Sequence, residues 1–196
     1  MYTNTDLKIL EQIYILPGIH TRGLARNLKM GMPSINNGLK NTRSLIKKQK
    51  SGNQIKYSLN YSKDALTPAL HCVEYSRLEQ LPQKIKISIR DFLKELLHKP
   101  ILSLLFGSYA KGNNTSASDI DILLVFQKTE NTKEIEYTSK KISMQTNTKL
   151  NPIYVDYNIF RQSFHNPTKE FFKNIKKDKI LLTGIEWWRQ LEDEES

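Results

Sequence analysis

The sequence of 196 residues has a single cysteine, Cys72, and lacks any long hydrophobic run. One cysteine forms neither an intrachain disulfide nor a cysteine-based zinc site, so we expect Cys72 to serve in packing. No apolar stretch approaches the roughly 20 residues that a membrane-spanning helix needs. Charged residues Asp6, Lys8 and Glu11 interrupt the N-terminal segment, where a signal peptide would be apolar. The sequence therefore predicts a cytoplasmic protein that does not associate with a membrane.

Acidic residues are scarce in residues 1–60. This part of the chain has ten Lys and Arg residues against two acidic residues, Asp6 and Glu11, which gives a net charge of +8. The whole chain has a net charge of +10, so residues 61–196 contribute only +2. A basic N-terminal part followed by a nearly balanced one is typical of proteins that bind nucleic acid through one domain.

The spacing of apolar residues predicts three short helices before residue 44. The first covers residues 5–16 and ends at Pro17-Gly18. The second begins near Thr21, a residue type that caps helices, and Gly31 ends it. Pro33 suits the first turn of the third helix, which has one polar side.

A basic β-hairpin is predicted after these helices. Residues 45–50 and 54–60 flank a turn at 51–53, and apolar residues alternate with polar ones in the second strand. Three helices and a hairpin resemble the winged helix-turn-helix of prokaryotic transcription regulators, in which the third helix enters the major groove of DNA. By position, the resemblance implies base contacts by Ser34, Asn36, Asn37 and Lys40 and phosphate contacts by Arg43, Lys47, Lys48, Lys50 and Lys56.

A protein contact is the alternative for this basic module, because winged helices also serve in dimerisation or in docking to other proteins. The next segment, 62–83, has apolar residues at helical spacing and predicts a linker helix that packs between domains or forms a dimer interface. We therefore expect three parts: 1–61 as the winged helix, 62–83 as the linker and 84–196 as the second domain.

The second domain contains the one stretch with the pattern of a chemical site. Apolar residues 101–106 predict a buried strand, 107–108 predict a turn, and another strand begins with two aspartates. Because alternate residues of a strand share a face, Asp119 and Asp121 point the same way and Ile120 points into the core. Two carboxylates in this position repel each other unless a cation lies between them, and oxygen ligands of this kind suit Mg²⁺.

The turn supplies the second half of this site. Glycine lets the backbone approach a ligand closely, and a serine hydroxyl with successive amide groups can hold phosphate oxygens. A metal and a phosphate site together indicate a nucleoside triphosphate. The complete pattern consists of Gly107-Ser108-x-Ala110-Lys111-Gly112 and Ser118-Asp119-x-Asp121.

This pattern resembles the signature of the minimal prokaryotic nucleotidyltransferases of the DNA polymerase beta superfamily. The resemblance covers roughly the last hundred residues and implies an α/β domain with a small mixed sheet, so that the whole chain is expected to be α+β. It implies that Asp119 and Asp121 hold two Mg²⁺ ions and act in catalysis. It also implies that the triphosphate of an NTP such as ATP is bound by Gly107, Ser108, Lys111 and Gly112.

The sequence departs from this family in two ways. Lys111 stands where the family usually has arginine, and lysine cannot bind phosphate with a planar fork. The family's third carboxylate falls on Asn151 when the strands are aligned, and Asp156 would need a shifted register to fill that place. We therefore expect Asp156 as the third catalytic residue only if the register is shifted.

Two functions are consistent with this sequence. The first is a Mg²⁺-dependent nucleotidyltransferase, joined to a DNA-binding winged helix, that transfers a nucleoside monophosphate to a hydroxyl of nucleic acid, a partner protein or a small molecule. The second is a DNA-binding transcription regulator or antitoxin-like protein whose degenerate nucleotidyltransferase fold senses a nucleotide or binds a partner. A carboxylate that reaches the two aspartates favours the first function, and its absence favours the second.

Overall fold

The structure is a computed structural model that describes residues 2–129, 132–166 and 170–195. The chain divides into two compact units, and the division falls between Val73 and Glu74, inside helix α4 (Leu66–Glu79). This position lies within the segment 62–83 that the sequence predicts as a linker. In the described part of the chain, no helix is both long enough and apolar enough to cross a membrane.

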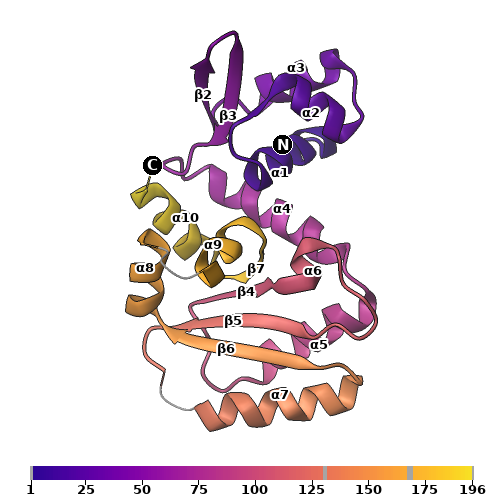
Figure 1. The fold of residues 1–196 in the computed structure, drawn as a ribbon, viewed down its shortest axis with the longest axis vertical. Coiled ribbons are helices and arrows are strands. Elements are labelled where there is room, and N and C mark those ends of the chain that lie inside the picture. The colour runs from indigo at the N-terminus through magenta and orange to yellow at the C-terminus, as the bar shows by residue number, and fades with distance from the viewer. Residues whose placement is uncertain (1, 130–131, 167–169, 196) are drawn as a thin grey trace. The chain divides into compact units, whose positions relative to one another are not determined.

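The first unit contains α1, β1, α2, α3, β2 and β3, drawn in indigo and purple in Figure 1. Their bounds are Asn4–Ile15, Ile19–His20, Thr21–Leu28, Met32–Asn41, Ile46–Ser51 and Gln54–Leu59. The strands form an antiparallel sheet in the order β1-β3-β2. The sequence predicts the three helices and the hairpin but misses β1. Classification of this unit as a winged helix-turn-helix stays a prediction.

Side-chain caps fix the starts of the first two helices. At the start of α1, the Thr3 hydroxyl accepts a hydrogen bond from the Asp6 amide at 3.2 Å, and the Asp6 carboxylate accepts one from the Thr3 amide at 2.9 Å. Helix α2 is capped by His20, whose Nδ1 accepts a hydrogen bond from the amide of Gly23 at 2.9 Å. Our expectation of a cap at Thr21 is wrong, because β1 keeps the backbone extended through His20 and Thr21 is already helical.

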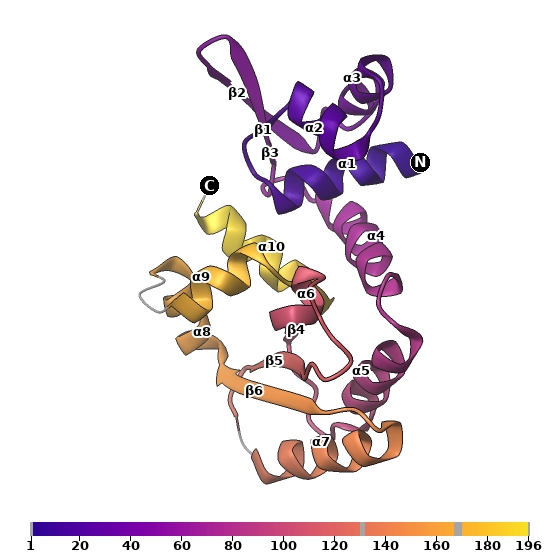
Figure 2. The same cartoon turned by 45° about the vertical axis from the view of Figure 1, so that its right-hand side comes forward.

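The second unit is built on a mixed sheet with the strand order β6-β5-β4-β7. Strand β4 (Leu102–Phe106) is antiparallel to β5 (Ile120–Phe126) and to β7 (Ile180–Thr183). Strand β6 (Leu150–Asp156) is parallel to β5. The helices of this unit are α5 (Gln83–Glu95), α6 (Gly107–Lys111), α7 (Thr132–Thr146), α8 (Tyr157–His165), α9 (Glu170–Lys177) and α10 (Ile185–Glu194). Helices α8, α9 and α10 lie on the side of the sheet away from α7 (Figure 2).

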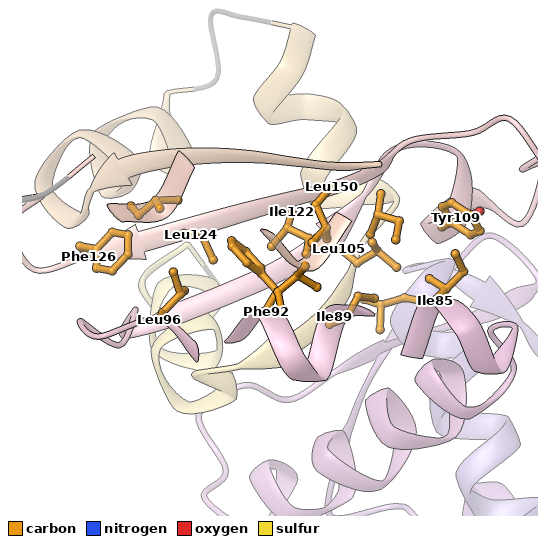
Figure 3. Packing of buried hydrophobic residues seen from close by; sticks show 14 residues of the cluster. Ile85, Ile89, Phe92, Leu96, Leu105, Tyr109, Ile122, Leu124, Phe126 and Leu150 are labelled. Atoms are coloured by element: carbon orange, nitrogen blue, oxygen red, sulfur yellow. The ribbon is translucent and has the colours of Figure 1, made fainter. Parts of the chain in front are cut away.

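The main core of this unit lies between the sheet and helices α5 and α7 (Figure 3). Ile120 and Ile122 of β5 are fully buried in it, as is Phe92 of α5. Burying one side chain of this size stabilises a protein by about 1.5–3 kcal/mol, so the pattern holds β5 in one orientation. Asp121 alternates with these isoleucines and is only half-buried, so its side chain points to the opposite face of the sheet. The unit thus has the small mixed sheet that the sequence predicts, and the chain as a whole is α+β, also as predicted.

Candidate active site

Strands β4, β5 and β6 each have one terminus at the same end of the sheet, and Asp121 lies there on β5, the central strand of the three. Because β4 is antiparallel to β5 and β6 is parallel to it, β4 ends where β5 and β6 begin. Phe106 at the end of β4 is the register partner of Asp121, and Asn151 at the start of β6 is its partner on the other side. At the start of this pairing, the amide of Ile120 donates a hydrogen bond of 2.7 Å to the carbonyl of Lys149, the residue just before β6.

Gly107 brings the backbone directly against the carboxylate of Asp121. Its φ of +73° lies in the left-handed region that favours glycine. A Cβ at this position would overlap Asp121 Oδ2 and lie 3.2 Å from its Cγ. No other residue type fits here without moving the aspartate. The turn and the aspartate, which the sequence predicts as separate halves of a site, are therefore in contact.

The residues with predicted phosphate contacts all belong to the short helix α6 and its C-terminal cap. Ser108 is half-buried in the first turn after Gly107, and Lys111 is exposed in the last turn. Gly112 ends the helix in the left-handed conformation, with a φ of +72°. The sequence predicts only a turn and a loop here, because five residues are too few to show a helical repeat.

Each aspartate has a partner from the segment that enters β6. Asp119 Oδ2 accepts a hydrogen bond from the ammonium group of Lys149 at 2.7 Å. This bond, followed by the attraction of the Asp119 charge, raises the pKa of Lys149 above its ordinary value. Asp121 Oδ1 accepts a hydrogen bond from the side-chain amide of Asn151 at 2.8 Å.

Sequence reasoning missed Lys149, although a signal for it was present. Lys149 precedes Asn151 by two residues, just as Asp119 precedes Asp121 by two. Once β5 and β6 are taken as parallel with Asp121 opposite Asn151, Lys149 must lie beside Asp119. The sequence alone left the register of β5 with β6 open, because it did not show whether Asn151 or Asp156 faces the two aspartates.

Asp156 lies far from the two other predicted catalytic residues. It pairs with Phe126 at the far end of β5, five residues beyond Asn151 and thus about 16 Å along the strand. There its Oδ1 accepts a hydrogen bond from the amide of Thr129 at 2.6 Å. Hydrogen bonding by Thr129 stabilises the charged form, so the pKa of Asp156 lies below its ordinary value. The register is not shifted, and the structure does not bring Asp156 together with Asp119 and Asp121.

The donor set that remains fits one Mg²⁺ ion better than two. Asp119 and Asp121 supply carboxylate oxygens, and the amide oxygen of Asn151 is a neutral and weaker ligand. In residues 2–129, 132–166 and 170–195, no third acidic, His or Cys side chain joins them. Mg²⁺ in nucleotide sites is commonly held by one or two carboxylates together with phosphate oxygens of the substrate. The two aspartates meet this requirement.

A cavity of about 570 Å³ opens beside Asp119. Its apolar part is formed by Ile85 and Tyr109, and its polar part by loops 114–118 and 147–149, which carry hydroxyl, amide and lysine side chains. The volume of this cavity lies within the range of small-molecule binding sites. Of helix α6, Tyr109 lines this cavity, whereas Gly107, Ser108 and Lys111 do not.

In the first unit, the hairpin lysines with predicted DNA contacts lie on two different faces. Lys48 is the register partner of Tyr57, which is buried, and Lys50 is the partner of Ile55, which is 47 % exposed. These side chains share one face of the hairpin, because every second residue of a strand points the same way. The opposite face carries the two other predicted lysines, Lys47 and Lys56.

The predicted DNA-contacting side chains of α3 and the segment after it are all exposed: Ser34, Asn36, Asn37, Lys40 and Arg43. A groove of about 530 Å³ runs beside α3 and is lined by Asn36, by Arg22 of α2 and by Gln54 of the hairpin. Arg22 was not identified from the sequence, because its position on the groove depends on how α2 packs against α3. The groove therefore combines polar side chains from three elements.

Comparison with known proteins identifies relatives of the second unit. The family model of the nucleotidyltransferase domain matches residues 86–182, which include Gly107, both aspartates and Asn151. The chain is 34% identical over 106 residues to a candidate protein adenylyltransferase of Methanocaldococcus jannaschii, and the match covers 46% of this chain and 94% of that protein. Among solved structures, a crystal structure of a toxin-antitoxin with AMP-PNP is 18% identical and covers 58% of this chain and 83% of that one. Its TM-score of 0.42 is too low to establish a common fold.

We predict that Asp156→Asn lowers stability near neutral pH and leaves Mg²⁺ and nucleotide binding unchanged. Because the folded pKa of Asp156 is depressed, its carboxylate stabilises the fold above the ordinary aspartate pKa of about 3.9. This contribution is lost as the pH falls through the lower folded value, so wild type and variant should converge in acid. Urea unfolding between pH 3 and pH 7 measures the difference. If Asp156→Asn lost Mg²⁺ binding and kept its stability, Asp156 would belong to the metal site after all.

Proposed function

Because the chain belongs to the nucleotidyltransferase domain family, we propose that it binds a nucleoside triphosphate with Mg²⁺ and transfers the nucleoside monophosphate to a hydroxyl group, releasing pyrophosphate. The approach of Gly107 to the carboxylate of Asp121 supports this most strongly. With no side chain at Gly107, the carboxylate of Asp121 lies directly against the backbone of the turn at which the phosphates would bind. Phosphate and cation would then be neighbours, as the transfer requires.

The residues around the turn have distinct roles in this proposal. Asp119 and Asp121 would hold Mg²⁺, which when bound would polarise the phosphate oxygens and neutralise their charge. Ser108 can donate its hydroxyl hydrogen to a phosphate oxygen, and Lys111 supplies a positive charge. Asn151 cannot accept a proton at neutral pH, so its hydrogen bond orients Asp121. The acceptor hydroxyl would lose its proton to one of the two aspartates or to water.

We propose that the cavity beside Asp119 receives the acceptor. Phosphoryl transfer places the attacking and leaving oxygens roughly in line across the reacting phosphorus. If pyrophosphate lies against Gly107 and Ser108, the attacking hydroxyl must approach the phosphorus from the opposite side, and the cavity is lined by Asp119 but by neither Gly107 nor Ser108. The M. jannaschii relative is a candidate protein adenylyltransferase, which favours ATP as the donor and a protein hydroxyl as the acceptor.

A second function is favoured by one observation, the presence of Asn151 opposite Asp121. Without a third carboxylate, the domain would hold the nucleotide and its cation but transfer the nucleotide slowly or not at all. The protein would then be a nucleotide-sensing regulator or a partner-binding component. The two functions share the nucleotide site and differ in turnover.

We further propose that the first unit binds DNA with α3 and with the hairpin face that carries Lys48 and Lys50. The net charge of +8 in residues 1–60 supports nucleic-acid binding. The groove beside α3 supports base contacts by Asn36, while Arg22 and Gln54 at the same groove would contact bases or phosphates. Lys47 and Lys56, on the opposite hairpin face, would contribute only long-range attraction.

We predict that Asp119→Asn and Asp121→Asn each weaken Mg²⁺-dependent NTP binding by at least about tenfold, because each removes a charged ligand of the cation. Isothermal titration calorimetry with Mg²⁺ and with a chelator isolates this part of the affinity. Asp91→Asn is the matched control, since Asp91 lies on α5 and pairs with Arg90 at 3.1 Å. Equal NTP affinity with Mg²⁺ and with chelator in the wild type would refute the proposal.

We predict that Lys48→Ala/Lys50→Ala weakens DNA binding more than Lys47→Ala/Lys56→Ala, although both pairs remove two positive charges. A plot of log affinity against log salt concentration loses about one unit of slope for each phosphate contact removed. The first variant should therefore lose about two units of slope and the second less than one. Gel-shift titration at several salt concentrations measures these slopes. Identical slopes for both variants would show that the hairpin does not face DNA in this way.

A further inference from the structure

We infer that the ammonium group of Lys149 takes the place of a second divalent ion, so that the site binds one divalent ion with each nucleotide instead of two. The inference rests on the proposed function, because it concerns the same nucleotide site. Its starting point is the bond of 2.7 Å between the ammonium group of Lys149 and Asp119 Oδ2. An ammonium group at this distance takes the place of a second cation at Oδ2 of Asp119.

The backbone directs Lys149 to this place. Its carbonyl accepts a hydrogen bond of 2.7 Å from the amide of Ile120, the residue that separates the two aspartates. The side chain therefore starts beside Asp119 whatever rotamer it adopts. Asp121 is bonded to Asn151 instead, so the two carboxylates have different partners: a full positive charge at Asp119 and a neutral amide at Asp121.

The charges of the site support a single ion. Asp119 and Asp121 contribute two negative charges, and Lys149 cancels one of them. A chain with aspartate at position 151 and a neutral residue at position 149 would be more negative by two charges. This difference equals the charge of one Mg²⁺ ion. The wild-type site therefore reaches with one ion the charge balance that the altered site would reach with two.

Lys149 must compete with a metal ion to have this effect. Its side chain is 76% exposed, and an exposed ion pair is weak, so the ammonium group can move away from Asp119. It cannot move far, because the backbone bond to Ile120 holds its Cα beside the site. We therefore expect Lys149 to weaken binding of a second divalent ion at Asp119 and to leave in place the ion that Asp119 and Asp121 share with the nucleotide phosphates.

The number of bound Mn²⁺ ions tests this inference. The full chain would be titrated with Mn²⁺ in the presence of a saturating ATP analogue with a methylene group between the α- and β-phosphorus, and free Mn²⁺ would be measured by electron paramagnetic resonance. We expect one nucleotide-dependent ion for the wild type and for Lys140→Gln, an exposed lysine of α7 that serves as the charge-matched control. The double variant Lys149→Gln/Asn151→Asp should bind two.

The single variant Lys149→Gln keeps the test decisive if the double variant does not fold. It should bind Mn²⁺ about fivefold more tightly in the absence of nucleotide, as expected for the loss of one competing surface charge. Two ions per nucleotide in the wild type, or no change in Lys149→Gln, would overturn the inference alone. Failure of the wild type to bind any Mn²⁺ with the nucleotide would overturn the proposed function as well.

Discussion

The parallel pairing of β5 with β6 determines which side chains face the two aspartates. Ile120 and Ile122 are buried in the core, so a shift of β5 by one residue would exchange their positions with those of the aspartates and expose apolar surface. Core packing thus keeps the aspartates on the other face, where the register of β5 with β6 puts Asn151 opposite Asp121 and Asp156 at the far end of the strand. The composition of the site, with two carboxylates, one amide and one lysine, therefore depends on core packing for its face and on the register of β5 with β6 for its partners.

A second constraint joins the strands to the turn. Gly107 lies so close to the carboxylate of Asp121 that a Cβ would overlap it, so the end of β4 and the start of β5 depend on each other. Phe106, just before this glycine, has its ring edge against Phe171 of α9, with centroids 5.3 Å apart. Helix α9 thus packs against the end of β4, where the turn at Gly107 begins. The proposed phosphate and metal sites are held by the same short stretch of backbone.

Much of the fold follows from local sequence patterns. A continuous apolar run predicts β5, which is buried on both faces after Asp121, and the repeat from Ile85 to Leu96 predicts α5, which buries one face. The two aspartates and the Gly107 turn are predictable for the same reason, since they are close in sequence. Helix α6 and strand β1 are too short to show a period, and both were missed.

The rest of the site depends on contacts between distant segments. Lys149 reaches Asp119 across 30 residues of sequence, and Asn151 reaches Asp121 across the same separation. No local pattern shows whether Asn151 or Asp156 faces the aspartates, because both lie in the same strand. In the first unit, the division of the hairpin lysines between two faces depends in the same way on the strand register.

The central claim is that a cation at the two aspartates and a triphosphate at the Gly107 turn share one site. A crystal structure of the full chain with Mn²⁺ and a non-hydrolysable ATP analogue, with anomalous scattering to locate the metal, tests it most directly. The account predicts an anomalous peak within coordination distance of Asp121, with phosphate density against Gly107 and Ser108. A peak at Asp156, or triphosphate density away from the turn, would contradict it.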